Sequence, residues 1–161
     1  MCCGWGEKMS SILNPICRGI VGYVSYMATC SASEVYSEYL LYEPIMRIAQ
    51  SKGFSVQCEF PVSQGARGDA KRIDFDLLHK ERGERVGIEV KWVKKKTRNF
   101  DADVEKLQIH FLQKKAAGYL LIFGPKRFVS ESRPAKFLSQ GKLVEWAAGK
   151  THYAACWFRV S

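Results

Sequence analysis

Two neighbouring segments near the middle of the chain carry charged side chains at alternate positions. In the first segment Asp74 and Asp76 are separated by one phenylalanine, and in the second Glu89 and Lys91 are separated by one valine. Because alternate residues of a β-strand point to the same face, each segment, folded as a strand, presents its charged side chains on one face. A hairpin with its tip near residues 81–83 would bring either Asp74 or Asp76 level with Glu89.

Two carboxylates and one ammonium group on a shared face suit the binding of a divalent cation. Mg²⁺ prefers carboxylate oxygens and keeps several of its waters. Such a cation polarises a phosphoryl oxygen and lowers the pKa of a bound water. Lys91 can orient that water, help to deprotonate it, or neutralise the charge that develops at phosphorus. The alternative is a half-buried strand whose charged residues are merely solvated, and the acidic strand that precedes Glu89 favours the metal site over it.

Turn residues and apolar periodicity predict the elements that hold this pair of strands. A helix over residues 33–53 is either kinked at Pro44 or restarts with Pro44 in its first turn. The expected strands cover residues 54–62, 71–78, 85–92, 118–124 and 153–160, and further helices cover residues 101–115 and 134–148. Three consecutive strands before a crossover helix predict an α/β fold with a mixed sheet, an antiparallel meander followed by a parallel strand, flanked by helices.

The composition and the termini bound the organisation of the chain. Residues 1–32 lack a clear period, so we expect a flexible or loosely packed arm before a single domain over residues 33–161. The chain has 25 Lys and Arg residues and 16 Asp and Glu residues, and the resulting net charge of +9 favours a polyanionic partner such as nucleic acid. No stretch has the length of a transmembrane helix, and the six cysteines form no Cys-x-x-Cys pair. We therefore expect no membrane partner, no structural zinc site, and a soluble, cytoplasmic protein.

The spacing of the acidic residues resembles a known enzyme motif. Asp74, followed by fourteen residues and then by Glu89-Val-Lys91, is similar to the motif of the PD-(D/E)XK phosphodiesterases, the restriction endonuclease-like superfamily. The superfamily includes restriction enzymes, repair nucleases and Holliday-junction resolvases. The expected order of elements over residues 33–123 also matches its common core, whereas Ile73 stands where the name of the motif has proline.

The resemblance implies a nuclease that hydrolyses phosphodiester bonds with Mg²⁺ or Mn²⁺, most simply a DNA endonuclease. Asp74 and Glu89 would be metal ligands, the carbonyl of Val90 a further ligand, and Lys91 the catalytic lysine. Asp76 could replace Asp74, although Asp74 is favoured. The alternative is a nucleic-acid-binding module in a larger complex that keeps the fold without the activity. The presence of all the core residue types argues against that loss.

Members of the superfamily often add a glutamate from the first helix and basic residues around the substrate. Glu38 and Glu43 are the candidates for the glutamate, and the sequence leaves the choice between them open. Lys106 would hold a phosphate or the attacking water, or would form a solvated pair with Asp103, three residues before it. The candidates for phosphate contacts along the chain are Arg72, Lys94, Lys95, Lys96 and Arg98. Members that cut both strands commonly form homodimers, whereas the form of the substrate and its sequence specificity stay open.

Overall fold

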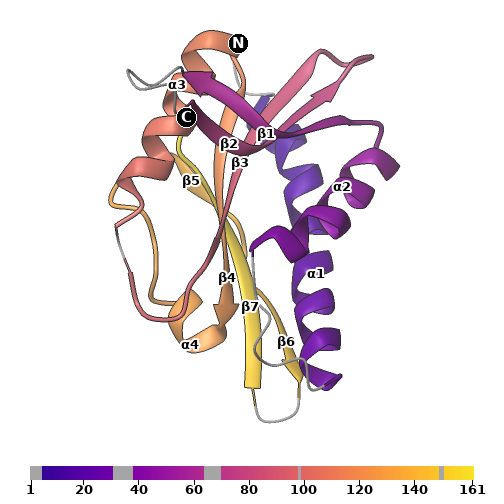
Figure 1. Cartoon of the computed structure of the whole chain (residues 1–161), viewed down its shortest axis with the longest axis vertical. Coiled ribbons are helices and arrows are strands. Elements are labelled where there is room, and N and C mark those ends of the chain that lie inside the picture. Colours follow the sequence, from indigo (N-terminus) through magenta and orange to yellow (C-terminus); the bar gives the residue numbers. More distant parts are fainter. Residues whose placement is uncertain (1–4, 31–37, 64–69, 98, 149–150) are drawn as a thin grey trace.

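One mixed sheet forms the centre of the structure. The computed structural model describes residues 5–30, 38–63, 70–97, 99–148 and 151–161. The strand order is β1-β2-β3-β4-β7-β5, with β6 also paired to β7 (Figure 1). The β3–β4 pair is parallel and every other described pair is antiparallel. The strands are β1 (Ser55–Ser63), β2 (Lys71–His79), β3 (Glu84–Trp92), β4 (Ala117–Pro125), β5 (Ser139–Gln140), β6 (Val144–Ala148) and β7 (Thr151–Arg159).

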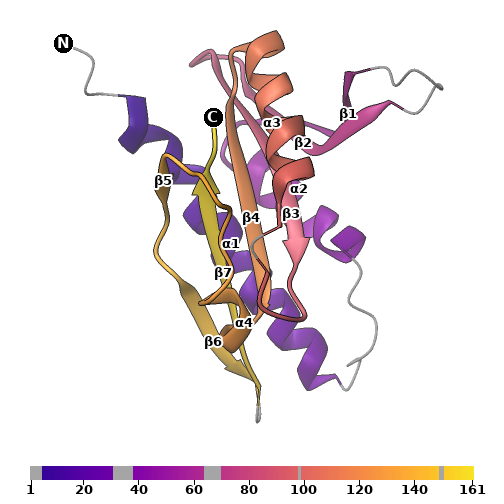
Figure 2. The ribbon, with the colours of Figure 1, turned by 90° about the vertical axis from the view of Figure 1, so that its left-hand side faces the viewer.

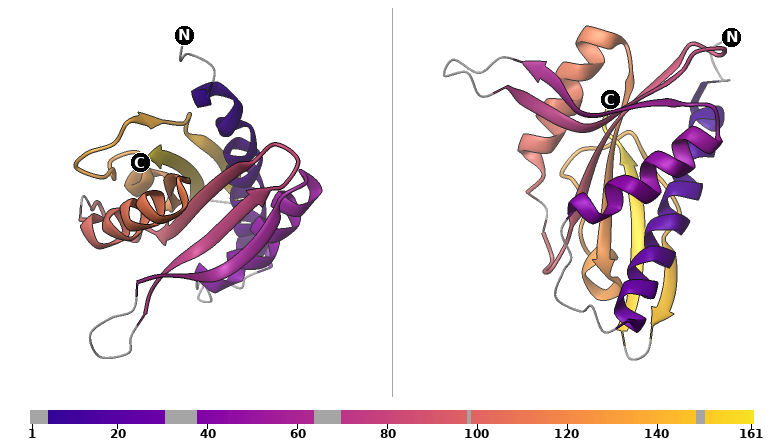
Figure 3. Two further views of the ribbon diagram at one scale, coloured as in Figure 1. Left: turned by 90° about the horizontal axis from the view of Figure 1, so that it is seen from above. Right: turned by 45° about the vertical axis from the view of Figure 1, so that its right-hand side comes forward.

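Helices cover both faces of the sheet. α1 (Trp5–Thr29) and α2 (Tyr42–Ser51) lie on one face, and α3 (Asp101–Lys114) and the short α4 (Lys126–Val129) lie on the other (Figure 3). A separate buried apolar cluster fills the space beneath each of these two helix layers. The prediction of an α/β fold with a mixed sheet flanked by helices is therefore confirmed.

The N-terminal segment differs from the loosely packed arm that the sequence predicts. Trp5–Thr29 forms one long helix, and its apolar side chains from Ile12 onward are buried against the sheet and α2. Pro15, Gly19 and Gly22 interrupt the sequence pattern, because proline and glycine are poor helix formers. Packing of the apolar face supplies most of the stability of such a helix. No described helix combines the length and the apolarity needed to cross a bilayer.

The helix expected over residues 134–148 is wrong, because this segment forms β5 and β6. The segment runs along the outer edge of β7, from the Leu138 N–H, which donates to the Arg159 carbonyl, to Ala148, which pairs with Thr151. Pairing along β7 satisfies backbone groups that a local helix would have satisfied internally. Tertiary contacts of this kind routinely override intrinsic propensity.

The helix expected over residues 33–53 is a 3-10 turn followed by a shorter α-helix in the part that the structure describes. A 3-10 turn, η1 (Glu38–Leu41), leads directly into α2, so Pro44 lies in the first turn of a new helix, which is one of the two predicted alternatives. A proline is tolerated there because the first helical N–H groups have no partner within the helix. The predicted start near residue 33 lies outside the described residues.

The β2–β3 hairpin and the following crossover position the charged residues of interest. Phe75 pairs with Ile88, and the hairpin turns at residues 80–83, close to the predicted tip. The chain then crosses over through α3 to the parallel strand β4. Figure 2 shows α3 running beside β3 and β4. The helix therefore covers the sheet face on which Glu89 lies.

Candidate active site

Asp74 lies at the point where β2 separates from β3. The paired register of the two strands ends at Phe75 and Ile88, and one step further Asp74 Oδ2 accepts a hydrogen bond of 2.7 Å from the Val90 N–H. Asp74 Oδ1 accepts a second hydrogen bond of 2.9 Å from the Tyr42 hydroxyl. Burial raises the pKa of Asp74, although these hydrogen bonds oppose the rise. The carboxylate is thus held in one orientation where the strands open.

Glu89 is a fully buried carboxyl close to Asp74. Its side chain is 0% exposed, and its Oε1 atom lies 2.7 Å from Lys106 Nζ. Burial and then the charge of Asp74 raise the pKa of Glu89 to about 8, against the opposing effect of Lys106. Its Oε2 atom has no hydrogen-bond partner among the residues that the structure describes. Burying such an oxygen is costly unless a proton or a cation satisfies it.

Two ammonium groups lie near these carboxylates, that of Lys91 from β3 and that of Lys106 from α3. Lys91 Nζ lies 3.5 Å from Asp103 Oδ1 and 3.8 Å from Glu38 Oε2. Lys106 Nζ lies 3.3 Å from the same Asp103 oxygen in addition to its contact with Glu89. Burial opposes the charge of both lysines, but the surrounding carboxylates raise the pKa of each above its usual value. Both side chains are therefore cations, and Lys106 rather than Lys91 makes the direct contact with Glu89.

The two glutamates that the sequence left open lie in different surroundings. Glu38 reaches the site, where its Oε1 atom accepts a hydrogen bond of 3.0 Å from the Trp92 N–H and its Oε2 atom faces Lys91. Glu43 instead forms an ion pair of 3.1 Å with Arg47, and its side chain is 69% exposed. Glu38 belongs to the charged cluster around β3, and Glu43 lies outside it.

Asp76 takes part in a separate buried network. Two hydrogen bonds from Arg85, of 2.8 and 2.6 Å, reach its two oxygens, and His110 Nε2 lies 2.9 Å from Oδ1. Burial favours the protonated carboxyl, but the hydrogen bonds from His110 and Arg85 outweigh it and lower the pKa of Asp76. Arg85 and His110 commit Asp76 to this separate network, whereas the charge of Asp74 acts on Glu89. This placement agrees with the preference for Asp74.

Sequence reasoning missed two residues at the site, Tyr42 and Glu59. The Tyr42 hydroxyl lies 2.5 Å from Glu59 Oε1 as well as 2.9 Å from Asp74 Oδ1. Glu59 stands in β1 between residues paired with Ile73 and Phe75, and its φ of 52° is unusual for a residue with a side chain. The helical spacing of Tyr42 indicated only a core position, and no sequence signal marks Glu59. Asp103, Lys106 and His110 did carry a sequence signal, because these polar residues recur at helical spacing on the inner face of α3.

The basic residues expected to contact phosphates are distributed unevenly. Lys94, Lys95 and Arg72 are exposed, and no ion pair involves them within the described part of the chain. Lys96 Nζ is held 3.2 Å from Glu131 Oε2. Arg98 lies outside the described residues. Among its described residues, the segment that leaves β3 therefore presents the ammonium groups of Lys94 and Lys95 outside any ion pair.

The oxygen donors at the site are of the kind that Mg²⁺ and Mn²⁺ bind. Asp74 and Glu89 offer carboxylates, and cations of this class usually bind through one or two carboxylates with waters and substrate oxygens completing the shell. Within the described ranges, no group of three or more His, Cys, Asp or Glu side chains is arranged to hold a metal ion. Val90 directs its N–H toward Asp74, and a metal contact from its carbonyl stays a prediction. The donor set fits a cation with two protein carboxylates and further ligands from solvent or substrate.

Comparison with known proteins adds no family or fold assignment: no family model, no curated protein and no solved structure matches the chain.

Proposed function

We propose that the chain is a metal-dependent phosphodiesterase that acts on nucleic acid, most simply a DNA endonuclease of the PD-(D/E)XK kind. The observation that carries the proposal is the fully buried carboxyl of Glu89, which lies beside Asp74 and within reach of a lysine ammonium group. A protein with a purely structural strand gains nothing from burying an acid with an unpaired oxygen. Perturbed acids of this kind are enriched at functional sites.

The topology around the site supports the same proposal. The β1-β2-β3 meander, the α3 crossover and the parallel strand β4 follow in the order expected of a restriction endonuclease-like core. α1 and the strands from β5 to β7 would then be additions at its two ends. Folds host many functions, however, so the argument for activity depends on the acidic site itself.

The residues of the chain would divide the chemistry as follows. A bound Mg²⁺ or Mn²⁺ ion would supply electrophilic activation of the phosphate and of the attacking water. Asp74 and Glu89 would hold that ion, and the hydrogen bonds from Val90 and Tyr42 would keep the Asp74 carboxylate oriented. Because the pKa values of Lys91 and Lys106 are raised, both side chains suit the stabilisation of negative charge rather than the removal of a proton.

The exposed lysines after β3 favour a polyanionic substrate. Lys94 and Lys95 follow directly on the strand that carries Glu89 and Lys91. Phosphate contacts from such residues give affinity and orientation but no base specificity. The proposal therefore favours cleavage that depends on the form of the nucleic acid rather than on a long sequence.

The test is cleavage of supercoiled plasmid DNA, single-stranded DNA and RNA in the presence of Mg²⁺ or Mn²⁺. We expect Asp74→Asn, Glu89→Gln and Lys91→Ala each to lower the rate by about 10²-fold or more, because the first two remove a proposed metal ligand and the third removes a positive charge placed for the transition state. Glu43→Gln is the matched control, since it converts an exposed carboxyl to an amide outside the site. Unchanged cleavage by Asp74→Asn together with Glu89→Gln would refute the assignment.

The same cleavage assay distinguishes the role of Lys91 from that of Lys106. If Lys106 supplies the principal charge, Lys106→Ala will lower the rate more than Lys91→Ala, as its direct contact with Glu89 suggests. The result that favours the alternative, a binding module without activity, is Mn²⁺ or nucleic-acid binding with no cleavage of any of the three substrates.

A further inference from the structure

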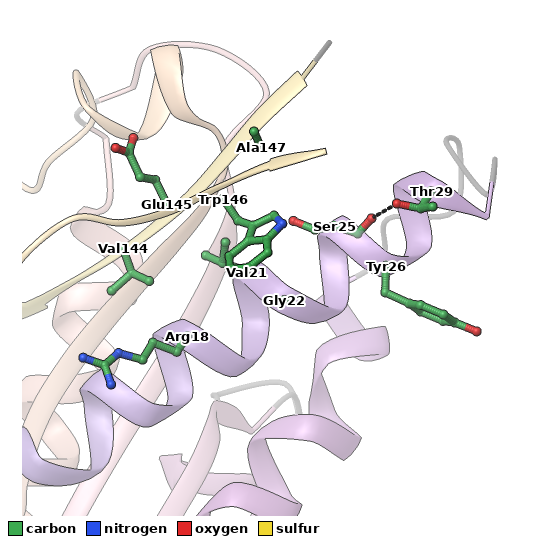
Figure 4. Close-up of a pocket in the computed structure, with 10 residues that line it drawn as sticks. All are labelled: Arg18, Val21, Gly22, Ser25, Tyr26, Thr29, Val144, Glu145, Trp146 and Ala147. Atoms are coloured by element: carbon green, nitrogen blue, oxygen red, sulfur yellow. Dashed lines mark hydrogen bonds between the residues drawn. The ribbon is translucent and has the colours of Figure 1, made fainter. Parts of the chain in front are cut away.

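A groove lies between α1 and β6, on the opposite face of the sheet from α3. Its volume is about 460 Å³. Figure 4 shows α1 along one wall and β6 along the other, with the Trp146 side chain extending toward Val21 and Gly22. The walls are formed by Arg18, Val21, Gly22, Ser25, Tyr26 and Thr29 of α1 and by residues 144–147 of β6. None of these residues belongs to the proposed active site.

The β6 wall is the edge of the sheet. Among the described strands β6 pairs with β7 alone, so the other edge of β6 leaves backbone N–H and C=O groups without a strand partner. Trp146, at its centre, is 64% exposed. Proteins usually protect such an edge, because an exposed apolar edge strand is a template for pairing with another strand. An added strand satisfies those backbone groups, whereas a nucleic acid does not have the matching backbone.

The α1 wall carries a stripe that is symmetric about a glycine. Arg18, Gly22 and Tyr26 are spaced by four residues, so they share one face of the helix. A Cβ atom built on Gly22 would meet nothing within 4 Å. Tyr26 is 63% exposed and points away from β6 in Figure 4. Arg18 is exposed and forms no ion pair with any residue in the described ranges.

This stripe is complementary to a second copy of itself. If two α1 helices cross antiparallel at Gly22, Arg18 of each copy meets Tyr26 of the other, because both lie four residues from the crossing point. A guanidinium over a tyrosine ring is a favourable pair, and glycine at the crossing lets the two backbones approach. A two-fold axis normal to the sheet would also run the two β6 edges antiparallel. The proposal requires that one such axis serve both walls, as in an isologous interface.

We propose that the groove is the interface of a symmetric dimer, in which the β6 edges of two copies continue one sheet and the α1 helices cross at Gly22. The occupant of the groove is a second copy of this chain. The proposal is independent of the phosphodiesterase activity, since it uses residues on the other face of the sheet and makes no use of Asp74 or Glu89.

Sedimentation equilibrium over a wide range of protein concentration tests the dimer. We expect wild-type protein to pass from the 18.3 kDa monomer to twice that mass with a dissociation constant on the order of micromolar. Gly22→Arg and Trp146→Glu should each weaken association by about tenfold or more, because they place charge at the crossing point and at the strand edge. Gly22 is open in the monomer, so the melting temperature of the diluted Gly22→Arg protein should not fall. Gln50→Arg, an exposed change on α2, is the matched control for added charge and should leave association unchanged.

A covalent trap tests the geometry separately. In Gly22→Cys, mild oxidation should link the two introduced thiols across the axis, and peptide mapping distinguishes that link from one through the exposed Cys30. Wild-type protein that stays monomeric up to about 1 mM would overturn the proposal, as would a dimer insensitive to both groove substitutions. A monomer whose Gly22 and Tyr26 NMR signals shift on addition of a thymidine oligonucleotide would also overturn it, in favour of nucleic acid as the occupant.

Discussion

Glu89→Gln should make the protein more stable at high pH while removing its proposed response to metal. In wild-type protein the folded state raises the pKa of Glu89 from 4.5 to about 8, mainly through burial. The folded state therefore retains a proton that the unfolded chain releases above pH 4.5. Stability linked to this group is highest below pH 4.5 and is lost as the pH rises toward 8. Glutamine has no such proton, so the variant should lack this part of the pH dependence.

The size of the effect follows from the two pKa values. Their difference corresponds to a cost of roughly 5 kcal/mol once Glu89 is ionised in the folded state. Between pH 5 and pH 8 the free energy of unfolding of the wild type should fall by roughly 3–4 kcal/mol relative to that of Glu89→Gln. Both proteins share the other titrating groups, so the difference between them isolates Glu89. Urea denaturation in EDTA at pH 5, 6, 7 and 8 measures it.

Metal should act in the opposite direction on the wild type. A divalent cation that binds ionised Glu89 stabilises the folded state, by nearly 3 kcal/mol at a concentration about 100 times its dissociation constant. We expect Mn²⁺ to restore wild-type stability at pH 8 and to leave Glu89→Gln nearly unchanged. Parallel curves for the two proteins from pH 5 to pH 8 in EDTA would refute the burial argument. Equal stabilisation of both proteins by Mn²⁺ would refute the metal assignment alone.

Three further substitutions test the packing around the site. Tyr42→Phe removes the hydroxyl that contacts Asp74 and Glu59, so we expect the free energy of unfolding in urea to fall by about 1 kcal/mol and Mn²⁺ binding in calorimetry to weaken. Unchanged Mn²⁺ affinity would exclude a role of Tyr42 in orienting Asp74. Asp76→Asn breaks a buried ion pair with Arg85 and should lower the free energy of unfolding by about 3 kcal/mol at pH 7. Because the pKa of Asp76 is lowered, this loss should shrink as the pH falls through that pKa, and a loss independent of pH would contradict the pairing. Gly87→Ala places a Cβ atom 2.6 Å from His110 Nδ1 and should lower the melting temperature through a loss of about 2 kcal/mol, so a variant as stable as wild type would show that α3 packs less closely on β3.

The sequence by itself determined the strand pair at the centre of the molecule. Alternating charged and apolar residues around Asp74 and Glu89, with turn residues between them, specify a hairpin, because alternation and turns are local properties of a strand pair. The register, which sets Asp76 opposite Gly87 and so brings Asp74 rather than Asp76 level with Glu89, came from the structure. The apolar run at residues 118–124 similarly specified a strand covered on both faces. From these elements the α/β class and the mixed sheet followed.

Elements that depend on distant partners were not visible in the sequence. Trp5–Thr29 contains proline and glycine, and its helix is stabilised by burial against strands more than a hundred residues away. Residues 138–148 follow the edge of β7 instead of forming the helix that their local pattern predicts. In both segments burial or strand pairing outweighs a weak local preference.

The candidate site shows the same division between local pattern and tertiary structure. Alternation along two strands was enough to identify Asp74, Glu89 and Lys91 as neighbours on a sheet. Only the tertiary structure decided that Lys106 contacts Glu89 and that Tyr42 contacts Asp74, because these contacts depend on how α3 and α2 pack on the sheet. Helix packing sets the positions of whole elements relative to one another, and no periodicity within a single element records it.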